Sequence, residues 1–310
     1  MAIIKTNEMD FSNEHITILL HGLPGVGKTT LACSAPKPIV IDCDNGMRRV
    51  SAEHRATTSV VKTYEDVLSD IEAVGDDYET IVIDTCGSLI ELMKQWVIDN
   101  KMCTIAKSGF ALQGYGIIKS EFSRLMAQLR RRYNVVYIFH ANKEKTEDSF
   151  FYELLCEGAT KATVWQPCDL GAFMYIQGGE RWLGFTPSEL YNAKSAYGIK
   201  GLIKIPELKD GKQNDYLTKL IATAKASLNS ETTLYKANRE AYEEVMTTGK
   251  AIIAAVNTPE DMPGAANALN QLHHVLTSKA ELKTHMSARM GELNIIYNGT
   301  EKKYEYKPEQ

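Results

Sequence analysis

The sequence of 310 residues lacks the features that would place it in a membrane or secreted class. It has no apolar run close to the roughly 18 residues that a membrane helix needs. Its first 15 residues include Lys5, Asp10 and Glu14, where a signal peptide would be apolar. Its six cysteines form no CxxC pair and have no metal-binding spacing, which is typical of reduced thiols. These absences predict a cytoplasmic protein without a membrane anchor.

The sequence also lacks a strong excess of charge of either sign. Thirty-five Lys plus Arg stand against 39 Asp plus Glu, which gives a formal net charge of −4. No global field therefore attracts the chain to nucleic acid, and any such binding must come from a local patch. Hydrophobic residues make up 44% of the chain and charged residues 24%, so we predict a globular protein with a sizeable core.

The first two thirds of the chain alternate apolar runs with amphipathic segments. The apolar runs predict strands, and the segments between them predict helices: strands at 16–20, 39–42, 81–84 and 135–140, helices at 63–74, 89–98 and 119–131. A later pair of runs, joined by Gly178-Gly179, predicts a β-hairpin. Uniformly apolar strands separated by helices are typical of a mainly parallel sheet covered on both faces. We therefore predict an α/β fold.

A polar segment at residues 229–233 is the best candidate for a domain boundary. We predict one domain over residues 1–228 and a helical C-terminal module over residues 231–310, with no strand in the module. Periodic apolar residues predict its helices at 234–256, 266–276 and 282–296. Such a small helical bundle would serve contacts with other subunits or with a partner protein.

The most specific pattern is Gly22-Leu23-Pro24-Gly25-Val26-Gly27-Lys28-Thr29, a complete GxxxxGK[ST] match between a predicted strand and a predicted helix. Glycines let successive backbone N–H groups point at a phosphate. Lys28 is expected to reach the β- and γ-phosphates, and the Thr29 hydroxyl to ligate Mg²⁺. The pattern predicts an ATP and Mg²⁺ site whose binding residues are Gly22, Pro24, Gly25, Val26, Gly27, Lys28, Thr29 and Thr30.

Besides the Thr29 hydroxyl, such a site needs a carboxylate that organises Mg²⁺. This carboxylate is expected at the end of a neighbouring strand. Asp84 is the first choice to share the metal with Thr29, and Asp42, which closes a similar run, competes for the role. Asp44 follows two residues later and is predicted to polarise the attacking water. His140 ends the fourth predicted strand, where a polar side chain would face the γ-phosphate and report its presence.

The order of these parts resembles the RecA-like ATPase core. It is more closely similar to small phage-type ATP-binding proteins of that class, some of which are single-strand annealing recombinases. The segments that carry the resemblance are GLPGVGKTT, IVIDCDNG, TIVIDTCGSL and VVYIFHANKEK, within roughly residues 14–225. The resemblance implies a RecA-like core with one extra strand between the P-loop strand and the Asp84 strand, and a homo-oligomer, either a ring or a filament. RecA-like cores usually have Glu where this sequence has Asp44, which implies slow turnover.

The resemblance also implies DNA-binding loops after the fourth and fifth strands, here residues 142–152 and 158–166. Cations interleaved with aromatic rings suit single strands, because phosphates take the charge and bases stack on the rings. Acidic neighbours such as Glu144 and Glu153 largely cancel this charge, so ordinary surface loops are the alternative. The predicted DNA contacts are Lys143, Lys145, Phe150, Lys161 and Trp165.

These features together predict a DNA-stimulated ATPase that acts on single-stranded DNA in phage-type recombination, replication or repair. ATPases of this kind often take a cation from a neighbouring subunit, and Lys194 or Lys200 is the candidate. Two alternatives stay open. One is an ATP-dependent scaffold or loader that binds a protein through residues 231–310. The other is a small-molecule or nucleotide kinase, which would need an arginine-rich lid, whereas the dense arginine cluster at 130–132 precedes a core strand.

Overall fold

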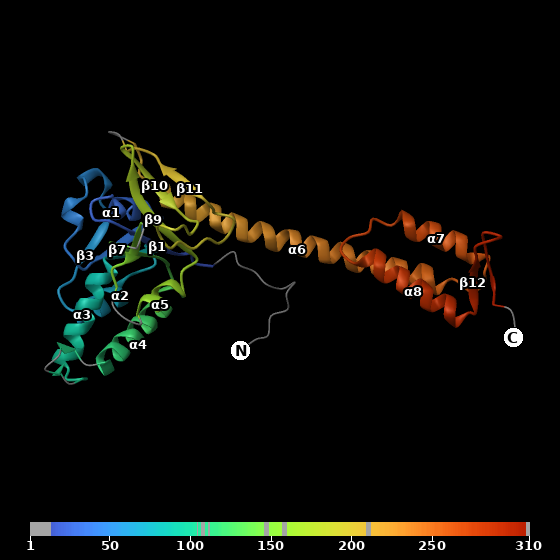
Figure 1. The fold of residues 1–310 in the computed structure, drawn as a ribbon, viewed down its shortest axis with the longest axis horizontal. Helices are drawn as coiled ribbons and strands as arrows, with labels where there is room; N and C mark the ends of the chain where they lie inside the picture. Colours follow the sequence, from blue (N-terminus) through green and yellow to red (C-terminus); the bar gives the residue numbers. More distant parts are fainter. Residues whose placement is uncertain are drawn as a thin grey trace. The chain divides into compact units, whose positions relative to one another are not determined.

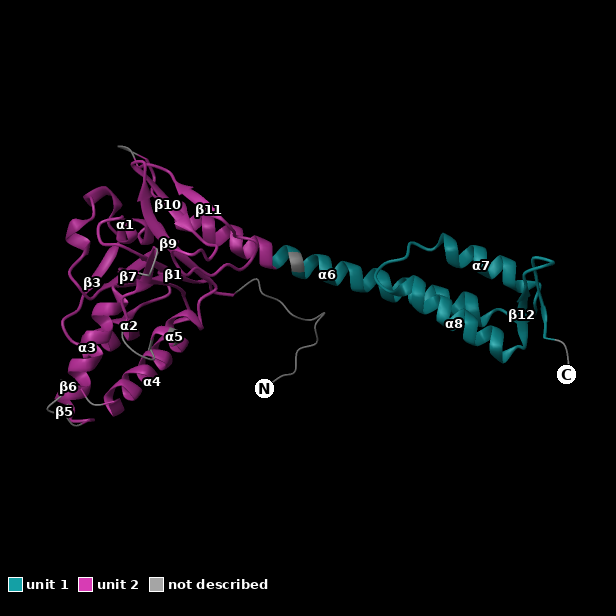
Figure 2. Ribbon diagram, viewed as in Figure 1, with its two compact units in different colours: residues 1–11, 229–310 teal, residues 12–228 magenta. Residues whose placement is uncertain are grey.

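The structure is a computed structural model that describes residues 14–103, 105–106, 109–110, 112–145, 149–156, 160–208 and 212–307. The chain divides into two compact units, with the boundary between Leu228 and Asn229 (Figure 2). Among the helices of these residues, none combines the length and the apolar character that crossing a membrane requires. Each unit is described by itself below.

The first unit alternates strands and helices, as the apolar pattern predicted (Figure 1). Its strands are β1 (Thr17–Gly22), β2 (Pro38–Asp42), β3 (Thr57–Val60), β4 (Thr80–Asp84), β5 (Ile105–Ala106), β6 (Gly109–Phe110), β7 (Asn134–Lys145), β8 (Phe150–Leu154), β9 (Leu170–Gln177), β10 (Glu180–Gly184) and β11 (Leu202–Ile205). Its helices are α1 (Lys28–Ala32), α2 (Tyr64–Ala73), α3 (Cys86–Asp99), α4 (Leu112–Leu129), α5 (Thr160–Trp165), the start of α6 (Tyr216–Ala254), and the 3-10 helices η2 (Met47–Arg49) and η3 (Ala52–His54).

One nine-stranded sheet forms the frame of this unit. Its order is β11-β10-β9-β1-β7-β4-β2-β3, and β8 pairs with β7 outside this path. The six strands from β9 to β3 run parallel, whereas β10, β11 and β8 are joined by antiparallel pairing. Strand β7 lies between β1 and β4, so the extra strand that the resemblance implied is present. The predicted hairpin is also confirmed, as β9 and β10.

Helices cover both faces of the sheet, because alternate strand residues are apolar on each side. One buried cluster joins the sheet to α2, α3, α4 and α5. A second cluster joins the opposite face to α1 and the beginning of α6. The predicted α/β class, with a mainly parallel sheet between layers of helices, is confirmed. The carboxyl ends of β1, β2, β4 and β7 meet at one edge of this sheet, and this edge positions the site described below.

Helix α6 runs without interruption from Tyr216 to Ala254, through the segment at residues 229–233 that was predicted as a domain boundary. The polar residues of this segment lie in successive helical turns, and Thr233 Oγ1 bonds the carbonyl of Asn229, one turn earlier, at 2.9 Å. The segment contains neither Pro nor Gly, so nothing in its chemistry ends a helix.

The second unit contains the later part of α6 with α7 (Asp261–Gln271) and α8 (Ser278–Glu292). Apolar residues of these helices form its own buried cluster. It also contains the antiparallel hairpin of β12 (Ile295–Asn298) and β13 (Lys303–Tyr306), so the prediction that this module has no strand is wrong. The β-branched and aromatic run at residues 295–297, the turn residues Asn298-Gly299 and the alternating Tyr304 and Tyr306 are the signal that predicts such a hairpin.

Candidate active site

The GxxxxGK[ST] segment forms the loop between β1 and α1. Strand β1 is buried along its whole length between β7 and β9, which fixes the place where the loop begins. Gly27 precedes α1 in a left-handed conformation, with φ of 103°, which a side chain would strain. A Cβ atom at Gly22 would collide with the carbonyl oxygen of Met174 on β9. The two glycines therefore let this loop close tightly against the sheet.

Lys28, the first residue of α1, points back over this loop and is only 5% exposed. Its Nζ donates hydrogen bonds to the carbonyl oxygens of Gly22 and Leu23, each at 2.9 Å. Burial lowers the pKa of Lys28 to about 8, and the nearby carboxylates of Asp84 and Asp44 oppose this shift. The ammonium is thus held at the mouth of the loop, where a bound phosphate would meet it.

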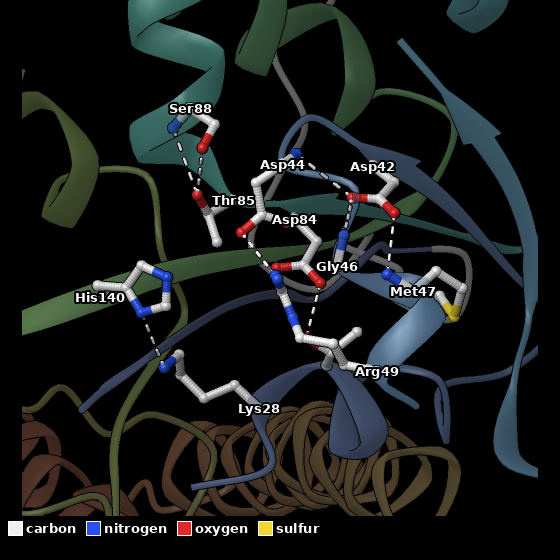
Figure 3. A network of polar contacts seen from close by, with 11 residues as sticks. Lys28, Asp42, Asp44, Gly46, Met47, Arg49, Asp84, Thr85, Ser88 and His140 are labelled. Atoms are coloured by element: carbon white, nitrogen blue, oxygen red, sulfur yellow. Dashed lines mark hydrogen bonds and ion pairs between the residues drawn. The ribbon is translucent and has the colours of Figure 1, made fainter. Parts of the chain in front are cut away.

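His140 lies on β7, opposite Gly22 in the register of β1 and β7. Its Nδ1 is 3.4 Å from Lys28 Nζ (Figure 3). Burial and the positive charge of Lys28 both lower the pKa of His140. The ring is therefore neutral at neutral pH and can accept a hydrogen bond from Lys28 at Nδ1. The structure brings together the two side chains that were predicted to meet the γ-phosphate.

Asp84 ends β4 beside the loop, and Thr29 Oγ1 donates a 2.7 Å hydrogen bond to its Oδ2. Burial, with Asp44 and Asp42 nearby, raises the pKa of Asp84 to about 6, against the Thr29 hydrogen bond, which lowers it. A hydroxyl and a buried carboxylate at this separation fit Mg²⁺, which prefers oxygen ligands and takes few from protein beside phosphate. Within the described residues, no group of three or more His, Cys, Asp or Glu side chains has the arrangement of a metal cluster.

Asp42, the alternative to Asp84, has a different role in the structure. Its carboxylate accepts hydrogen bonds from the backbone N–H groups of Asp44, Gly46 and Met47, at 3.3, 2.8 and 2.9 Å. These bonds use both oxygens and shape the loop that follows β2. Asp42 therefore holds the loop, while Asp84 contacts Thr29.

Asp44 lies in this loop with its two carboxylate oxygens in different surroundings (Figure 3). Oδ2 accepts a 3.2 Å hydrogen bond from Nη2 of Arg49, a residue of η2. Oδ1 is buried and has no hydrogen-bond partner among the described residues. A buried carboxylate oxygen without a partner can accept a hydrogen bond from water. Arg49 was missed by sequence reasoning, because nothing in Met47-Arg48-Arg49 shows which arginine turns toward the carboxylates.

The residues predicted to contact DNA lie on or near the β7–β8 hairpin. Strand β7 continues from His140 to Lys145 and pairs with β8, so residues 142–145 and 150–152 form a hairpin rather than a free loop. Lys143 Nζ lies 3.8 Å from the centre of the Phe150 ring, and that ring is 44% exposed. Residues 146–148 and 157–159, which complete the two predicted loops, lie outside the described residues.

The other predicted contacts have partners inside the chain. Lys161 on α5 forms a 2.9 Å ion pair with Glu153. Trp165 packs tightly over Gly171, and its ring meets His21 edge-on at 5.4 Å. Lys194 Nζ donates to the carbonyl oxygens of Trp165 and Gln166, at 3.4 and 3.3 Å. In this structure Lys194 therefore contacts the end of α5 in its own chain, and Lys200, its alternative, is exposed.

A cavity of about 580 Å³ lies beside the phosphate loop, and of its lining residues only Gly27 and Thr30 were predicted from the sequence as part of a binding site. Arg181 of β10 reaches this cavity, and its Nε donates a 3.0 Å hydrogen bond to the carbonyl of Val26 in the loop. Most of its lining residues are polar, and its apolar and aromatic side chains come from α1, β9, β11, the segment after β11 and the start of α6, which only the fold brings together. The lining includes Gly27, Thr30, Leu31, Arg181, Pro206 and Tyr216.

A sequence profile described as an AAA domain matches residues 14–197, which include the phosphate loop, the three aspartates and His140. The chain belongs to the AAA domain family. Members of this family are P-loop ATPases, so this protein is a P-loop ATPase whose family binds nucleotide, usually with Mg²⁺. The match ends within the first unit and does not extend to α6, α7 or α8.

Solved structures that resemble the chain include two with low scores. The first is an ATPase from the type III secretion system of pathogenic bacteria, with 11% identity, a TM-score of 0.35 and coverage of 52% of either chain. The AAA domain protein thus spans about half the length of that chain. The second is the flagellar accessory protein FlaH from Methanocaldococcus jannaschii, with 9% identity and a TM-score of 0.31, covering 63% of this chain and 91% of FlaH. Both likenesses are too low to transfer an activity or a partner. No curated protein sequence matches the chain.

Proposed function

We propose that this ATPase hydrolyses ATP and couples the reaction to binding of single-stranded DNA. In the proposed reaction the backbone of residues 22–30 and the ammonium of Lys28 bind the phosphates. Thr29 and Asp84 would hold Mg²⁺, which when bound neutralises charge on the phosphate oxygens. Asp44 orients the attacking water through its unpartnered Oδ1 and accepts the water proton. His140, in contact with Lys28, responds to the presence of the γ-phosphate.

The cavity beside Arg181 supports the nucleoside half of this site. Gly27 and Thr30, which belong to the phosphate-binding segment, line one side of the cavity. Its other side combines polar side chains such as Lys212 and Asn214 with the apolar and aromatic surfaces of Pro206 and Tyr216. Its volume of about 580 Å³ lies in the usual range for small-molecule sites. We infer that the base lies against Pro206 and Tyr216, with Arg181 close to the phosphates.

Replacing Tyr216 with Ala is expected to weaken ATP binding about tenfold, because loss of stacking on one base costs roughly 1–3 kcal/mol. The affinity is measured by displacement of a fluorescent ATP analogue. Inorganic tripolyphosphate, which has no base, should bind the variant and the wild type equally. Tyr216→Phe keeps the ring and serves as the matched control. Equal ATP affinity in Tyr216→Ala and Tyr216→Phe would show that the base does not lie against Tyr216 in this cavity.

The observation that carries the DNA part of the proposal is the continuity of β7. This one strand contains His140, which contacts the phosphate-binding Lys28, and Lys143, which lies over the Phe150 ring. The two residues are three positions apart, which corresponds to about 10 Å along a strand. A movement of His140 on phosphate binding would therefore be transmitted directly to the hairpin. This continuity supports a DNA contact whose strength depends on the bound nucleotide.

The proposal assigns the DNA contact to Lys143, Lys145 and Phe150. Both lysines are exposed, and the exposed ring can stack on a base while the cations meet phosphates. Lys161 and Trp165 are weaker candidates for the DNA contact. Lys161 is paired with Glu153, and Trp165 is packed against Gly171 of the sheet. The charge in this hairpin is small, so binding releases few counterions and its dependence on salt should be shallow.

Reversing both charges, as Lys143→Glu with Lys145→Glu, is expected to weaken binding of a single-stranded oligonucleotide at least about tenfold at moderate salt. Fluorescence anisotropy of a labelled oligonucleotide measures this, and the dependence on salt should decrease by about two counterions. Lys279→Glu with Lys283→Glu on α8 changes the net charge equally at exposed positions and is the matched control. Equal loss in both double variants would mean that only the net charge acts, and the hairpin would have no special role.

The kinase alternative receives less support from the site. The arginine cluster at residues 130–132 lies just before the first residue of β7. His140 lies further along this strand, opposite Gly22 of the phosphate loop. The cluster therefore cannot form a lid over the phosphates that reach Lys28. The scaffold alternative is favoured by one observation: Tyr297 and Tyr306, on one face of the β12–β13 hairpin, are 53% and 55% exposed. ATP binding without any response to DNA would favour that alternative.

A further inference from the structure

One cation near the three aspartates has no role in the reaction proposed above. Arg49 ends η2, whose position is set by the hydrogen bonds of Asp42 to Gly46 and Met47. Its Nη2 lies 3.2 Å from Asp44 Oδ2, and its side chain is 61% exposed, so a ligand can reach the guanidinium. A rigid loop thus presents a long, accessible cation at the carboxylate that is proposed to orient water.

The guanidinium is also close to the other groups of the site. A Cβ atom placed on Gly46 would lie 3.1 Å from Arg49 Nη2, 2.6 Å from Asp44 Oδ1 and 3.6 Å from Asp84 Oδ2. The charge of Arg49 also contributes to the lowered pKa of His140 on β7. Figure 3 shows Arg49 extended toward Asp44 and Asp84. One guanidinium therefore lies close to the carboxylate of the loop after β2 and acts electrostatically on His140 of β7.

The pairing of Arg49 with Asp44 has a cost for catalysis. While Asp44 Oδ2 is bound to the guanidinium, that oxygen is occupied and is not available to a water molecule. A γ-phosphate at Lys28 would bring more negative charge than Asp44 does, and a guanidinium binds phosphate in two-pronged geometry. The stronger anion is expected to attract Arg49, whose side chain is exposed and free to reorient.

We propose that Arg49 is a catalytic residue that leaves Asp44 for the γ-phosphate of ATP bound to the same chain. The proposal rests on the ATP hydrolysis proposed above. As the water oxygen bonds to the γ-phosphorus, the bond from that phosphorus to the bridging oxygen breaks and its electron pair stays on ADP. The water proton goes to Asp44, which Arg49 has released, and Arg49 remains protonated throughout. This exchange makes both carboxylate oxygens of Asp44 available only when the γ-phosphate is present.

The test compares Arg49→Ala and Arg49→Lys with Arg48→Ala, an exposed neighbour outside the site. Binding is measured first, by displacement of a fluorescent ADP analogue with ATP and with ADP. The wild type and Arg48→Ala should bind ATP more tightly than ADP. In Arg49→Ala the ratio of the two affinities should fall at least about fivefold. Arg49→Lys keeps the positive charge but cannot form two parallel hydrogen bonds to a phosphate. This variant should therefore retain part of the preference for ATP. An unchanged preference in Arg49→Ala would overturn the proposal.

Turnover provides the second readout. Arg49→Ala should lower kcat about 100-fold or more, the loss typical of a group that stabilises charge in the transition state. Mixing Arg49→Ala with Lys28→Ala distinguishes the same chain from a neighbouring one. No recovery of activity supports action within one chain, whereas recovery in the mixture would overturn it. If the wild type does not hydrolyse ATP, the proposed function fails, while the ATP preference still decides whether Arg49 meets the γ-phosphate.

Discussion

Replacing Asp44 with Asn is expected to leave ATP bound while lowering kcat about 10²- to 10⁴-fold, the usual contribution of a general base. Asn has the same shape as Asp, so it can keep a hydrogen bond to water through its oxygen, but it cannot accept the water proton. The buried Oδ1 of Asp44, which has no partner among the described residues, is the atom on which this expectation depends. Release of phosphate in a steady-state assay measures kcat, and displacement of a fluorescent nucleotide measures binding.

Asp76→Asn is the matched control for this variant. Asp76 is fully exposed and pairs with Arg132 at the surface, so the same chemical change there should leave both kcat and affinity at wild-type values. Turnover by Asp44→Asn close to that of Asp76→Asn would show that another group activates the water. A simultaneous loss of ATP binding would show that Asp44 holds the nucleotide instead.

Replacing Lys28 with Ala is expected to lower kcat/KM for ATP about 10²- to 10³-fold, because a preorganised charge aimed at the transferred phosphate is lost. The Nζ of Lys28 bonds two loop carbonyls in the structure, so the truncation also removes contacts that shape the loop. Lys62→Ala, at an exposed position before α2, is the control. Thermal unfolding with and without ATP separates binding from folding, since a ligand stabilises only a protein that binds it.

The wild type and Lys62→Ala should unfold at a higher temperature in the presence of ATP, and Lys28→Ala should not. A Lys28→Ala protein that is folded, is stabilised by ATP to the same extent and turns over ATP at the wild-type rate would contradict the assignment of Lys28 to the phosphates.

The sequence was most informative where one residue type has one physical task. Apolar strand runs predicted the parallel sheet, because a strand covered on both faces must be apolar along its length. The glycine and lysine pattern predicted the loop at residues 22–29, because few sequences can turn backbone N–H groups inward in this way. Asp84 follows from the same logic, since it ends an apolar run and the structure places it beside Thr29.

Other features depend on contacts that a single segment does not reveal. The edge strand β3 is short and largely polar, so its pattern does not distinguish it from a loop. The hairpin of β7 and β8 was predicted as a loop. Its charged residues belong to the same strand as the buried residues before them, and their change to polar character looked like the end of that strand. Arg49 and Arg181 acquire their importance only from tertiary neighbours, one from Asp44 and the other from the carbonyl of Val26.

The most direct test of the account is the rate of ATP hydrolysis by the full chain, measured with and without a single-stranded oligonucleotide. The account predicts that DNA raises kcat in the wild type, that Lys143→Glu with Lys145→Glu loses this increase but keeps the basal rate, and that Lys28→Ala loses both. An ATPase rate that is the same with and without DNA, in a protein that binds and hydrolyses ATP, would contradict the coupling of the site to the β7–β8 hairpin.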